Sequence, residues 1–233
     1  MTTGAELPLD KESSRIRAMF GRVAPRYDLL NHLLSASLDR AWRRRSASRL
    51  ALPAGSRVLD LCAGTGDQAV ELARRGYRAT AADFCLPMLA LSRPKFRSEK
   101  AVPPTPLQAD ALALPFGDGE FDGATVSVGQ RNVADLDRAF GELARVVRPG
   151  GALGVLEFTV PTWQPLRALY LFYFRFLLPA IGRLLSGDRA AYSYLPESVL
   201  RFPQRERFLA RAEASGFTKG RFESLSGGIV ALY

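Results

Sequence analysis

The most constraining stretch of this sequence is residues 57–73, where an apolar run ends in a small-residue turn and a helical pattern follows. Arg57–Leu61 predicts a buried strand, Gly64–Gly66 a tight turn and Asp67–Ala73 the start of a helix. Glycine lets a ligand approach the backbone, and the first turn of a helix offers free N–H groups. In a parallel α/β sheet, such a strand–turn–helix unit is where a nucleotide-like ligand binds.

An acidic residue follows at the spacing that such a site requires. Tyr77–Asp83 predicts the next strand, which ends in the carboxylate of Asp83. An acid about twenty residues after the glycines commonly accepts hydrogen bonds from ribose hydroxyls. The two segments together predict a site for a nucleoside-containing cofactor.

Two cofactors fit that pattern. Residues 64–69 satisfy the loose G-x-G-x-x-G/A form of a dinucleotide site, so NAD is one candidate. Asp67 in the first helical turn complements the helix dipole, but its carboxylate would repel a pyrophosphate. S-adenosyl-L-methionine (SAM) has no phosphate and carries a positive sulfonium and an amino group, so a turn flanked by Asp60 and Asp67 suits it better. The residues favour SAM, with an NAD site and a glycine turn without a ligand as alternatives.

The overall charge raises the question of an anionic partner. The formal net charge is +9, from 32 Lys and Arg against 23 Asp and Glu. A basic excess favours nucleic acid or an anionic membrane surface. The excess is almost entirely arginine, densest within residues 40–49, and genome composition also produces such a skew. Charge alone therefore does not assign a partner.

Composition disfavours several kinds of site and location. Two cysteines, Cys62 and Cys85, predict a reduced intracellular protein rather than a disulfide framework. The single histidine, His32, is too few for zinc sites that need two and for most Ser-His-Asp schemes, so no metal is expected. Residues 1–10 lack the pattern of a signal peptide, and the most apolar stretch, 166–185, is interrupted by three arginines and a proline. We expect a cytoplasmic protein, free or peripheral at the inner face of the cell membrane.

The rest of the sequence alternates strand and helix patterns, which predicts an α/β fold with a Rossmann-like, doubly wound, mostly parallel seven-stranded sheet. Asp135 is expected to cap a helix. The last two strands are expected to form an antiparallel closing pair. The further strands are predicted at 105–108, 121–128, 152–158, 217–222 and 228–233. The ligand site of such a sheet lies at the carboxyl ends of its strands; those ends carry Asp60, Asp83, Asp110, Ser127 and Glu157.

We expect a single domain over residues 1–233 with two helical additions. Residues 1–52 form an N-terminal helical cap, which either closes over the cofactor or covers a sheet edge. Residues 161–203 form an insertion after the fifth strand. Its apolar stretch is either a buried helix or subunit contact, or else a wall for a lipid-like substrate or a membrane-facing surface.

The motifs resemble those of the ubiquinone/menaquinone biosynthesis C-methyltransferases, a family of class I SAM-dependent methyltransferases, from about Phe20 to the C-terminus. Two positions differ from the usual pattern: Asp39 stands where the family commonly has His, and Leu30 where Met is usual. The matching signatures are Tyr27-Asp28-x-x-Asn31-x-x-Leu34-Ser35 with Trp42, Gly129-Gln130-Arg131-Asn132-Val133, Arg145-Val146-Val147-Arg148-Pro149-Gly150-Gly151 before Leu156-Glu157-Phe158-Thr159, and Tyr192-x-Tyr194-Leu195-x-Glu197-Ser198.

The resemblance implies a SAM site, with S-adenosylhomocysteine as product. The family's SAM contacts fall on Thr65, Asp83, Asp110, Ala111 and Ser127. The turn itself adds Asp60, Gly64 and Gly66 as expected cofactor-binding residues.

The resemblance also implies a prenylated quinol lipid whose ring carbon receives the methyl group. We expect conversion of demethylmenaquinol to menaquinol in menaquinone biosynthesis, with 2-polyprenyl-6-methoxy-1,4-benzoquinol of ubiquinone biosynthesis as the alternative; no residue separates them. Expected partners are the lipid, a peripheral membrane contact and a second copy of the chain as a homodimer. Nucleic acid is not expected, because residues 127–130 lack the Asn/Asp-Pro-Pro-aromatic motif of many base methyltransferases.

Methylation at carbon needs an electron-rich ring, and ionising a quinol hydroxyl supplies it. A free phenol has a pKa near ~10, so a cation or donor facing the ring is required. Arg131 and Asn132, just after the fourth strand, are the expected catalytic residues, with Tyr192 as a third. The remaining alternatives are a nucleic-acid or other small-molecule methyltransferase, a SAM-binding module without catalysis, and an NAD oxidoreductase.

Overall fold

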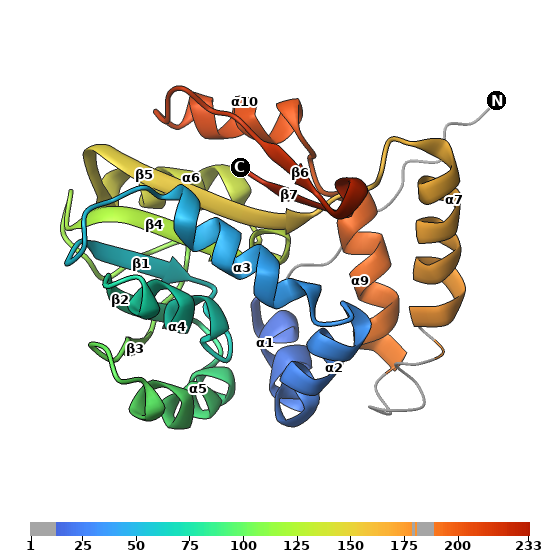
Figure 1. Ribbon diagram of the computed structural model, residues 1–233, viewed down its shortest axis with the longest axis horizontal. Coiled ribbons are helices and arrows are strands. Elements are labelled where there is room, and N and C mark those ends of the chain that lie inside the picture. The colour runs from blue at the N-terminus through green and yellow to red at the C-terminus, as the bar shows by residue number, and fades with distance from the viewer. Residues whose placement is uncertain (1–12, 179, 181–188) are drawn as a thin grey trace.

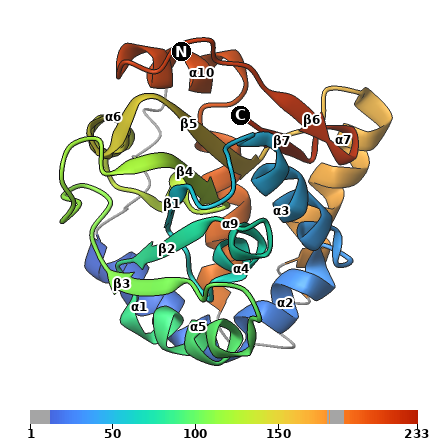
Figure 2. The ribbon, with the colours of Figure 1, turned by 60° about the vertical axis from the view of Figure 1, so that its left-hand side comes forward.

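The structure is a computed structural model that describes residues 13–178, 180 and 189–233. A sheet of seven strands in the order β3-β2-β1-β4-β5-β7-β6 forms its centre (Figure 1). Figure 2 shows the same order, with β3 at one edge and β6 and β7 at the other. The strands are β1 Arg57–Leu61, β2 Arg78–Asp83, β3 Thr105–Gln108, β4 Phe121–Ser127, β5 Val147–Phe158, β6 Glu223–Leu225 and β7 Val230–Leu232.

Strands β1 to β5 pair in parallel, β7 pairs antiparallel with β5, and β6 pairs antiparallel with β7. This confirms the expected doubly wound, mostly parallel seven-stranded sheet with an antiparallel closing pair. The helices are α1 Ser13–Val23, α2 Tyr27–Leu34, α3 Leu38–Arg49, α4 Asp67–Arg74, α5 Leu86–Ser98, α6 Leu136–Val146, α7 Gln164–Phe172, α9 Arg189–Arg201 and α10 Glu206–Ala214. Short turns of other helical types are η1 Ala24–Arg26, η2 Gln130–Asn132, η3 Tyr173–Leu177 and η4 Ser226–Gly228.

Alternate residues of the central strands point to opposite faces of the sheet, so each face has its own core. Val58 of β1 packs with α3 and α4, whereas its neighbour Leu59 packs with α6 and α10. Asp135 caps α6 as predicted, because its Oδ1 accepts hydrogen bonds from the backbone N–H groups of Asp137 and Arg138. The residues of both cores are buried, which fixes the strand ends that carry the site.

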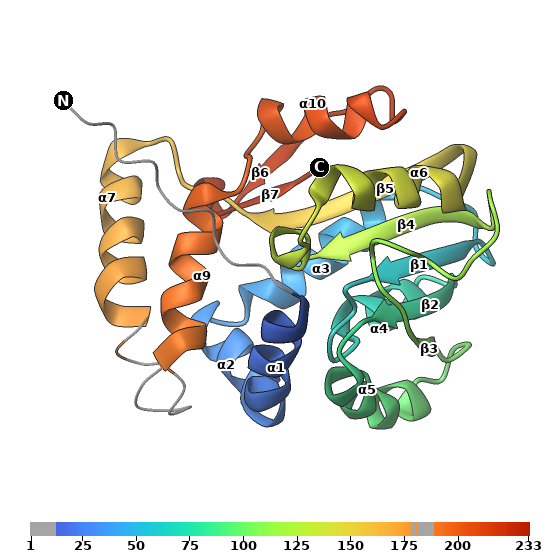
Figure 3. The ribbon, with the colours of Figure 1, turned by 180° about the vertical axis from the view of Figure 1, so that it is seen from behind.

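The helices outside this sandwich gather at the carboxyl ends of the strands. Helices α1 and α2 lie between α5 and α9 (Figures 1 and 3), and α1 contacts both. Helices α7 and α9 run side by side next to them, joined by a core that includes Leu30, Tyr170, Phe174 and Val199. No helix among the described residues is long and apolar enough to cross a membrane.

Two sequence-based boundaries are wrong. The strand expected at residues 217–222 is absent; the edge strand is β6, Glu223–Leu225. Gly216 and Lys219 have positive φ angles of 100° and 56°, which an extended strand does not allow. The strand predicted at 152–158 begins earlier, at Val147, so the Pro-Gly-Gly sequence at 149–151, which is typical of a turn, lies inside β5, whose register against β4 shifts between Phe121 and Gly123. A bulge therefore absorbs the residues that the sequence pattern assigns to a turn.

Candidate active site

Four strand ends meet at one cavity, as a parallel sheet requires. We call it the strand-end cavity. The turn after β1, the end of β2, the segment after β3 and the end of β4 all contribute to its wall. Of the eight residues expected to bind the cofactor, six line this cavity: Gly64, Thr65, Asp83, Asp110, Ala111 and Ser127.

The other two, Asp60 and Gly66, lie behind the wall and are not among its lining residues. Asp60 is completely buried and accepts a hydrogen bond from Thr125 Oγ1 at 2.9 Å. Gly66 has a φ of +85°, and a Cβ there would lie 2.5 Å from the ring of Phe96. Both residues shape the turn from beneath.

The carboxylate of Asp83 fixes the glycine turn to the end of β2. Its Oδ2 accepts from the backbone N–H of Gly64 at 2.8 Å, and its Oδ1 accepts from that of Cys85 at 2.8 Å. Burial raises the pKa of Asp83, and these two N–H groups oppose that rise. Each oxygen retains a lone pair for a ligand.

Asp60, behind the strand-end cavity, is an acid whose pKa is strongly perturbed. Burial raises the pKa of Asp60 to about 7, although the hydroxyl of Thr125 and the positive charge of Arg43 oppose the rise. Its Oδ2 has no hydrogen-bond partner. A buried acid with a strongly raised pKa next to a glycine turn is typical of a functional site.

The N-terminal helices close the other side of the strand-end cavity, through Phe20 of α1 and Tyr27 of α2. Asp28 accepts a hydrogen bond from the hydroxyl of Thr65, within the turn itself. Lys95 of α5 lies 2.6 Å from both Asp28 Oδ2 and Asp67 Oδ1. These contacts tie α2 to the turn and to α5. Sequence reasoning missed them, although Tyr27 and Asp28 belong to a matching signature.

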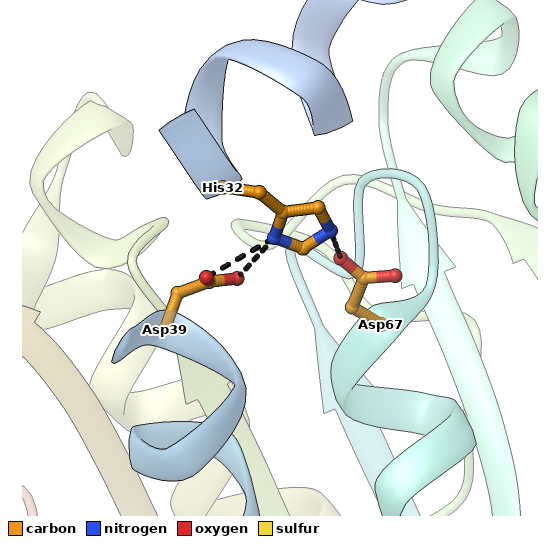
Figure 4. Close-up of side chains that lie close together, drawn as sticks. All are labelled: His32, Asp39 and Asp67. Atoms are coloured by element: carbon orange, nitrogen blue, oxygen red, sulfur yellow. Dashed lines mark hydrogen bonds and ion pairs between the residues drawn. The ribbon is translucent and has the colours of Figure 1, made fainter. Parts of the chain in front are cut away.

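His32 lies between two carboxylates (Figure 4): its Nδ1 is 3.0 Å from Asp39 Oδ2 and its Nε2 is 4.0 Å from Asp67 Oδ2. These three residues are a candidate metal group by proximity. The two acids sit at opposite edges of the imidazole, however, so its nitrogens point away from each other and toward different acids (Figure 4). Lys95 also occupies Oδ1 of Asp67. The group connects α2, α3 and α4 rather than surrounding a cation.

A second cavity, of about 470 Å³, lies between the N-terminal helices and the α7–α9 pair. We call it the apolar cavity, because most of its wall is aliphatic or aromatic. Phe20, Tyr27, Val128 and Asn132 line both cavities, so the two adjoin. The apolar lining includes Met19, Val23, Leu30, Leu34, Trp42, Phe158, Leu166, Phe174, Leu178 and Ile229.

The inner end of the apolar cavity is polar. Arg131 Nη1 donates to the carbonyl of Val128 at 2.6 Å and to Oε1 of the buried Glu157 at 2.8 Å. Four buried polar atoms of its lining have no hydrogen-bond partner: Arg131 Nε, Asn132 Oδ1, Tyr170 Oη and Tyr194 Oη. Burial raises the pKa of both tyrosines, and the charge of Arg131 opposes that rise. Unpartnered buried donors and acceptors are ready to bind a polar group.

Arg131 and Asn132, the expected catalytic residues, both line the apolar cavity, and their role stays a prediction. Tyr192 lies in α9, but its side chain is outside the described residues. Tyr170 and Tyr194 were missed as site residues. Tyr194 could have been found, because it belongs to the same signature as Tyr192. Tyr170 stands in a run of aromatics that gives no sign of which ring points inward.

The opposite end of the apolar cavity opens at the surface. Leu38, Leu169 and Leu177 line the cavity and are also 45%, 64% and 44% exposed. Leu38 lies on α3, Leu169 on α7 and Leu177 on η3; further exposed apolar side chains lie on α7 and η3 and on α2. We call the whole set the apolar rim: Leu29, Leu33, Leu38, Leu169, Phe172, Phe176 and Leu177. Exposed apolar side chains at the mouth of a cavity, as Leu38, Leu169 and Leu177 are, are typical of a contact surface.

Comparison with known proteins decides the family. Residues 9–233 match the ubiE/COQ5 methyltransferase family. The chain belongs to this family. The demethylmenaquinone methyltransferase of Thermus thermophilus is 48% identical over 217 residues, which cover 92% of this chain and 98% of that protein. The ubiquinone/menaquinone biosynthesis C-methyltransferase UbiE of Citrifermentans bemidjiense is 43% identical over 97% of both chains.

Solved structures agree on the fold. A possible histamine N-methyltransferase from Thermotoga maritima has a TM-score of 0.63 at 19% identity and covers 92% of this chain and 96% of its own. The [4+2]-cyclase SpnF has a TM-score of 0.70 at 22% identity, over 96% of this chain and 78% of its own. Membership of the ubiE/COQ5 family confirms the expectations of a methyltransferase and of SAM as cofactor.

Proposed function

We propose that this chain transfers the methyl group of SAM to a ring carbon of a prenylated quinol, converting demethylmenaquinol to menaquinol. The observation that carries the proposal is the junction of the two cavities, where Val128 and Asn132 line both. A polar ligand at the strand ends and a lipid in the apolar cavity would meet there. Relatives from Thermus, Parafrankia and Mycobacterium carry the name demethylmenaquinone methyltransferase.

A second substrate is favoured by the names of other relatives. The proteins of Citrifermentans bemidjiense and of a Geobacter strain are named ubiquinone/menaquinone biosynthesis C-methyltransferase. A benzoquinol is smaller than a naphthoquinol, so a cavity of about 470 Å³ that admits the larger ring does not exclude the smaller one. Benzoquinol methylation is therefore the alternative that the assay must include.

The residues of the strand-end cavity fit the cofactor. When bound, SAM supplies an electrophilic methyl group on its sulfonium. Asp83 would accept from the ribose hydroxyls, and Asp110, which uses Oδ1 for the N–H of Leu112 at 2.9 Å, would accept from the adenine amino group. The buried hydroxyl of Ser127 has no hydrogen-bond partner and would form a hydrogen bond with the bound cofactor. Thr65, Gly64 and Ala111 would contribute the rest of the wall, with Asp60 and Gly66 supporting the turn.

The inner end of the apolar cavity supplies what a quinol ring needs. Arg131 would stabilise the phenolate, and Asn132 and the hydroxyls of Tyr170 and Tyr194 would bind the ring oxygens. Each unit by which the pKa of the phenol falls is worth roughly 1.4 kcal/mol, and a nearby guanidinium acts in that direction. Glu157 is a positioning residue, because it holds Arg131 from the side away from the cavity. Alignment of the reacting atoms would contribute on the order of 7–11 kcal/mol more.

We further propose that the apolar rim contacts the surface of a membrane, from which the lipid enters. Leu38, Leu169 and Leu177 connect the rim to the cavity, so a prenyl tail could leave the protein there without crossing polar surface. A second copy of the chain is the other candidate occupant of this face. Sedimentation without lipid would show a dimer in that case, and a monomer that binds vesicles in the other.

The test is an assay of the purified protein with SAM and two reduced substrates, a demethylnaphthoquinol and a methoxybenzoquinol. We expect S-adenosylhomocysteine and a ring-methylated naphthoquinol, both detected by mass spectrometry. SAM binding without product would identify a non-catalytic module. Thermal stabilisation by NAD alone would identify an oxidoreductase. Tight binding of nucleic acid at physiological salt would favour a nucleic-acid enzyme, since phosphate-driven binding weakens steeply as salt rises.

A further inference from the structure

The strand-end cavity contains one cation among four charged lining residues of the described chain. Three carboxylates face it, from Asp67, Asp83 and Asp110, and the cation is the guanidinium of Arg43. Neither the expected cofactor residues nor the proposed mechanism uses Arg43. A cation placed among acids in a ligand cavity requires an explanation.

Arg43 is not a surface arginine. It lies on α3, on the side that packs toward the sheet, and is 9% exposed. Its Nε is buried and has no hydrogen-bond partner. A buried N–H of a charged group without an acceptor costs free energy, so such a group is expected to be completed by a ligand.

Asp39, one turn earlier on α3, does not complete it. Asp39 Oδ2 lies 3.7 Å from Arg43 Nε, which is beyond hydrogen-bond distance. The carboxylate of Asp39 is already bound by His32 Nδ1 at 3.0 Å and by the hydroxyl of Ser35 at 2.9 Å. Asp39 therefore offsets the charge of Arg43 while leaving its donors free.

The position of Arg43 also matches one end of the ligand. Its charge acts on Asp60, the acid at the end of β1, whereas Asp83 and Asp110 follow β2 and β3. Arg43 thus lies at the β1 side of the cavity, away from the acid that would accept from adenine. The amino-acid part of the cofactor would occupy that side.

We propose that Arg43 binds the α-carboxylate of the amino-acid part of SAM, an inference that rests on the proposed function. SAM carries three charged groups: a sulfonium, an ammonium and a carboxylate. The three acids of the cavity attract the two cations and repel the carboxylate. Arg43 is the lining residue of opposite sign, and the planar guanidinium matches a carboxylate with two parallel donors.

The decisive experiment compares two ligands by calorimetry: S-adenosylhomocysteine, and its decarboxylated analogue, which lacks only the carboxylate. The wild-type protein should bind the first more tightly, by roughly 10- to 150-fold, the ratio that corresponds to a hydrogen bond with a charged group. Equal affinities would overturn the proposal without any variant. If neither ligand binds, the proposed function fails together with this inference.

Variants of Arg43 then test whether this residue causes the preference for the ligand that carries the carboxylate. Arg43→Met should weaken S-adenosylhomocysteine by that same ratio and leave the decarboxylated analogue within about threefold. Arg43→Lys should retain part of the preference. Arg40→Met, at an exposed arginine of the same helix, should change neither affinity. Equal weakening of both ligands in Arg43→Met would show a structural role instead, and an undiminished preference would exclude Arg43 as the carboxylate receptor.

Discussion

Arg131 and Glu157 form a buried ion pair, with Nη1 of Arg131 2.8 Å from Oε1 of Glu157. The side chain of Arg131 is 7% exposed and that of Glu157 is 0% exposed. The pair joins η2, after β4, to the end of β5, and it lies at the polar end of the apolar cavity. Removing one partner of such a pair leaves an uncompensated charge, whereas removing both does not.

Arg131→Met should therefore fail in two separable ways. The unfolding free energy should fall by about 3–5 kcal/mol, because Glu157 stays buried without its partner. Turnover should fall by roughly 10²-fold or more, while the affinity for SAM is unchanged. The double variant Arg131→Met/Glu157→Gln should regain stability and not turnover. Wild-type turnover in the stable double variant would remove Arg131 from the mechanism.

Asp60 makes the stability of the protein depend on pH. Its pKa is raised to about 7 in the folded state from 3.8, so the folded protein holds this proton more tightly than the unfolded chain. The unfolding free energy should therefore decrease as pH rises between about 4 and 7, by an amount on the order of a few kcal/mol. Asp83, whose pKa is also raised, contributes with the same sign.

Asp60→Asn tests this directly, since Asn keeps an acceptor for the hydroxyl of Thr125. Chemical denaturation at pH 5 and pH 8 should show that the stability of the variant relative to the wild type is greater at pH 8 than at pH 5. An equal difference at both pH values would show that Asp60 does not titrate in this range.

Asp83→Asn should lower the affinity for S-adenosylhomocysteine by about 100-fold, because one hydrogen bond to a charged acceptor, worth about 1.5–3 kcal/mol, would be lost. Asn still accepts from one of the two N–H groups that Asp83 holds, so the turn is less disturbed than in Asp83→Ala. Calorimetry and a melting curve on the same sample separate binding from folding. An unchanged affinity would remove Asp83 as the ribose receptor.

The sequence predicts best which residues share one cavity where those residues lie at strand ends. Thr65, Asp83, Asp110 and Ser127 are brought together by a topology that alternation alone predicts, since parallel strands present their carboxyl ends at one edge. That these four residues lie close together can be predicted without knowing how any helix is oriented.

What could not be predicted comes from helices whose docking depends on tertiary contacts. Arg43 stands in a basic run, and nothing in that run shows that its side chain turns inward while that of Arg40 stays exposed. Lys95 lies 28 residues from Asp67 and meets it only because α5 packs beside the turn. The strand predicted at 217–222 was misplaced because apolar residues flank this segment. The pattern of apolar and polar residues does not reveal that backbone φ angles there are positive.

Lys95 holds the N-terminal helices against the glycine turn, through its contacts with Asp28 and Asp67. Lys95→Met should leave the two acids facing each other and loosen α2. Because the pair is partly exposed, the loss of stability should stay within about 1 kcal/mol. The dissociation rate of S-adenosylhomocysteine and proteolysis within residues 13–49 should both increase several-fold. Lys100→Met, at an exposed lysine just after α5, is the control. Equal dissociation and proteolysis rates in the two variants would show that Lys95 does not hold the N-terminal helices against the turn.

The apolar rim provides the last prediction. Leu169, Phe172 and Phe176 recur at spacings of three and four residues, so they form one stripe along α7 and η3. Phe172 and Phe176 are 52% and 62% exposed, with ring centroids 5.2 Å apart. Transferring one such side chain from water to an apolar environment is worth about 1.5–3 kcal/mol. Loss of both side chains should therefore be enough to abolish binding of the protein to a membrane surface.

The double variant Phe172→Ser/Phe176→Ser should therefore lose co-sedimentation with lipid vesicles and show at least a tenfold higher KM for a long-tailed quinol presented in them. Its kcat on a short-tailed, water-soluble quinol should match the wild type, because neither ring lines the polar end of the cavity. Val102→Ser, at a 62% exposed apolar residue shortly before β3 in the sequence, is the matched control and should retain vesicle binding. Strand β3 lies on the other side of the molecule from α7 (Figure 1). Equal vesicle binding by both variants would exclude the stripe as the membrane contact, and a fall in kcat on the short-tailed substrate would show that the substitutions disturb the cavity itself.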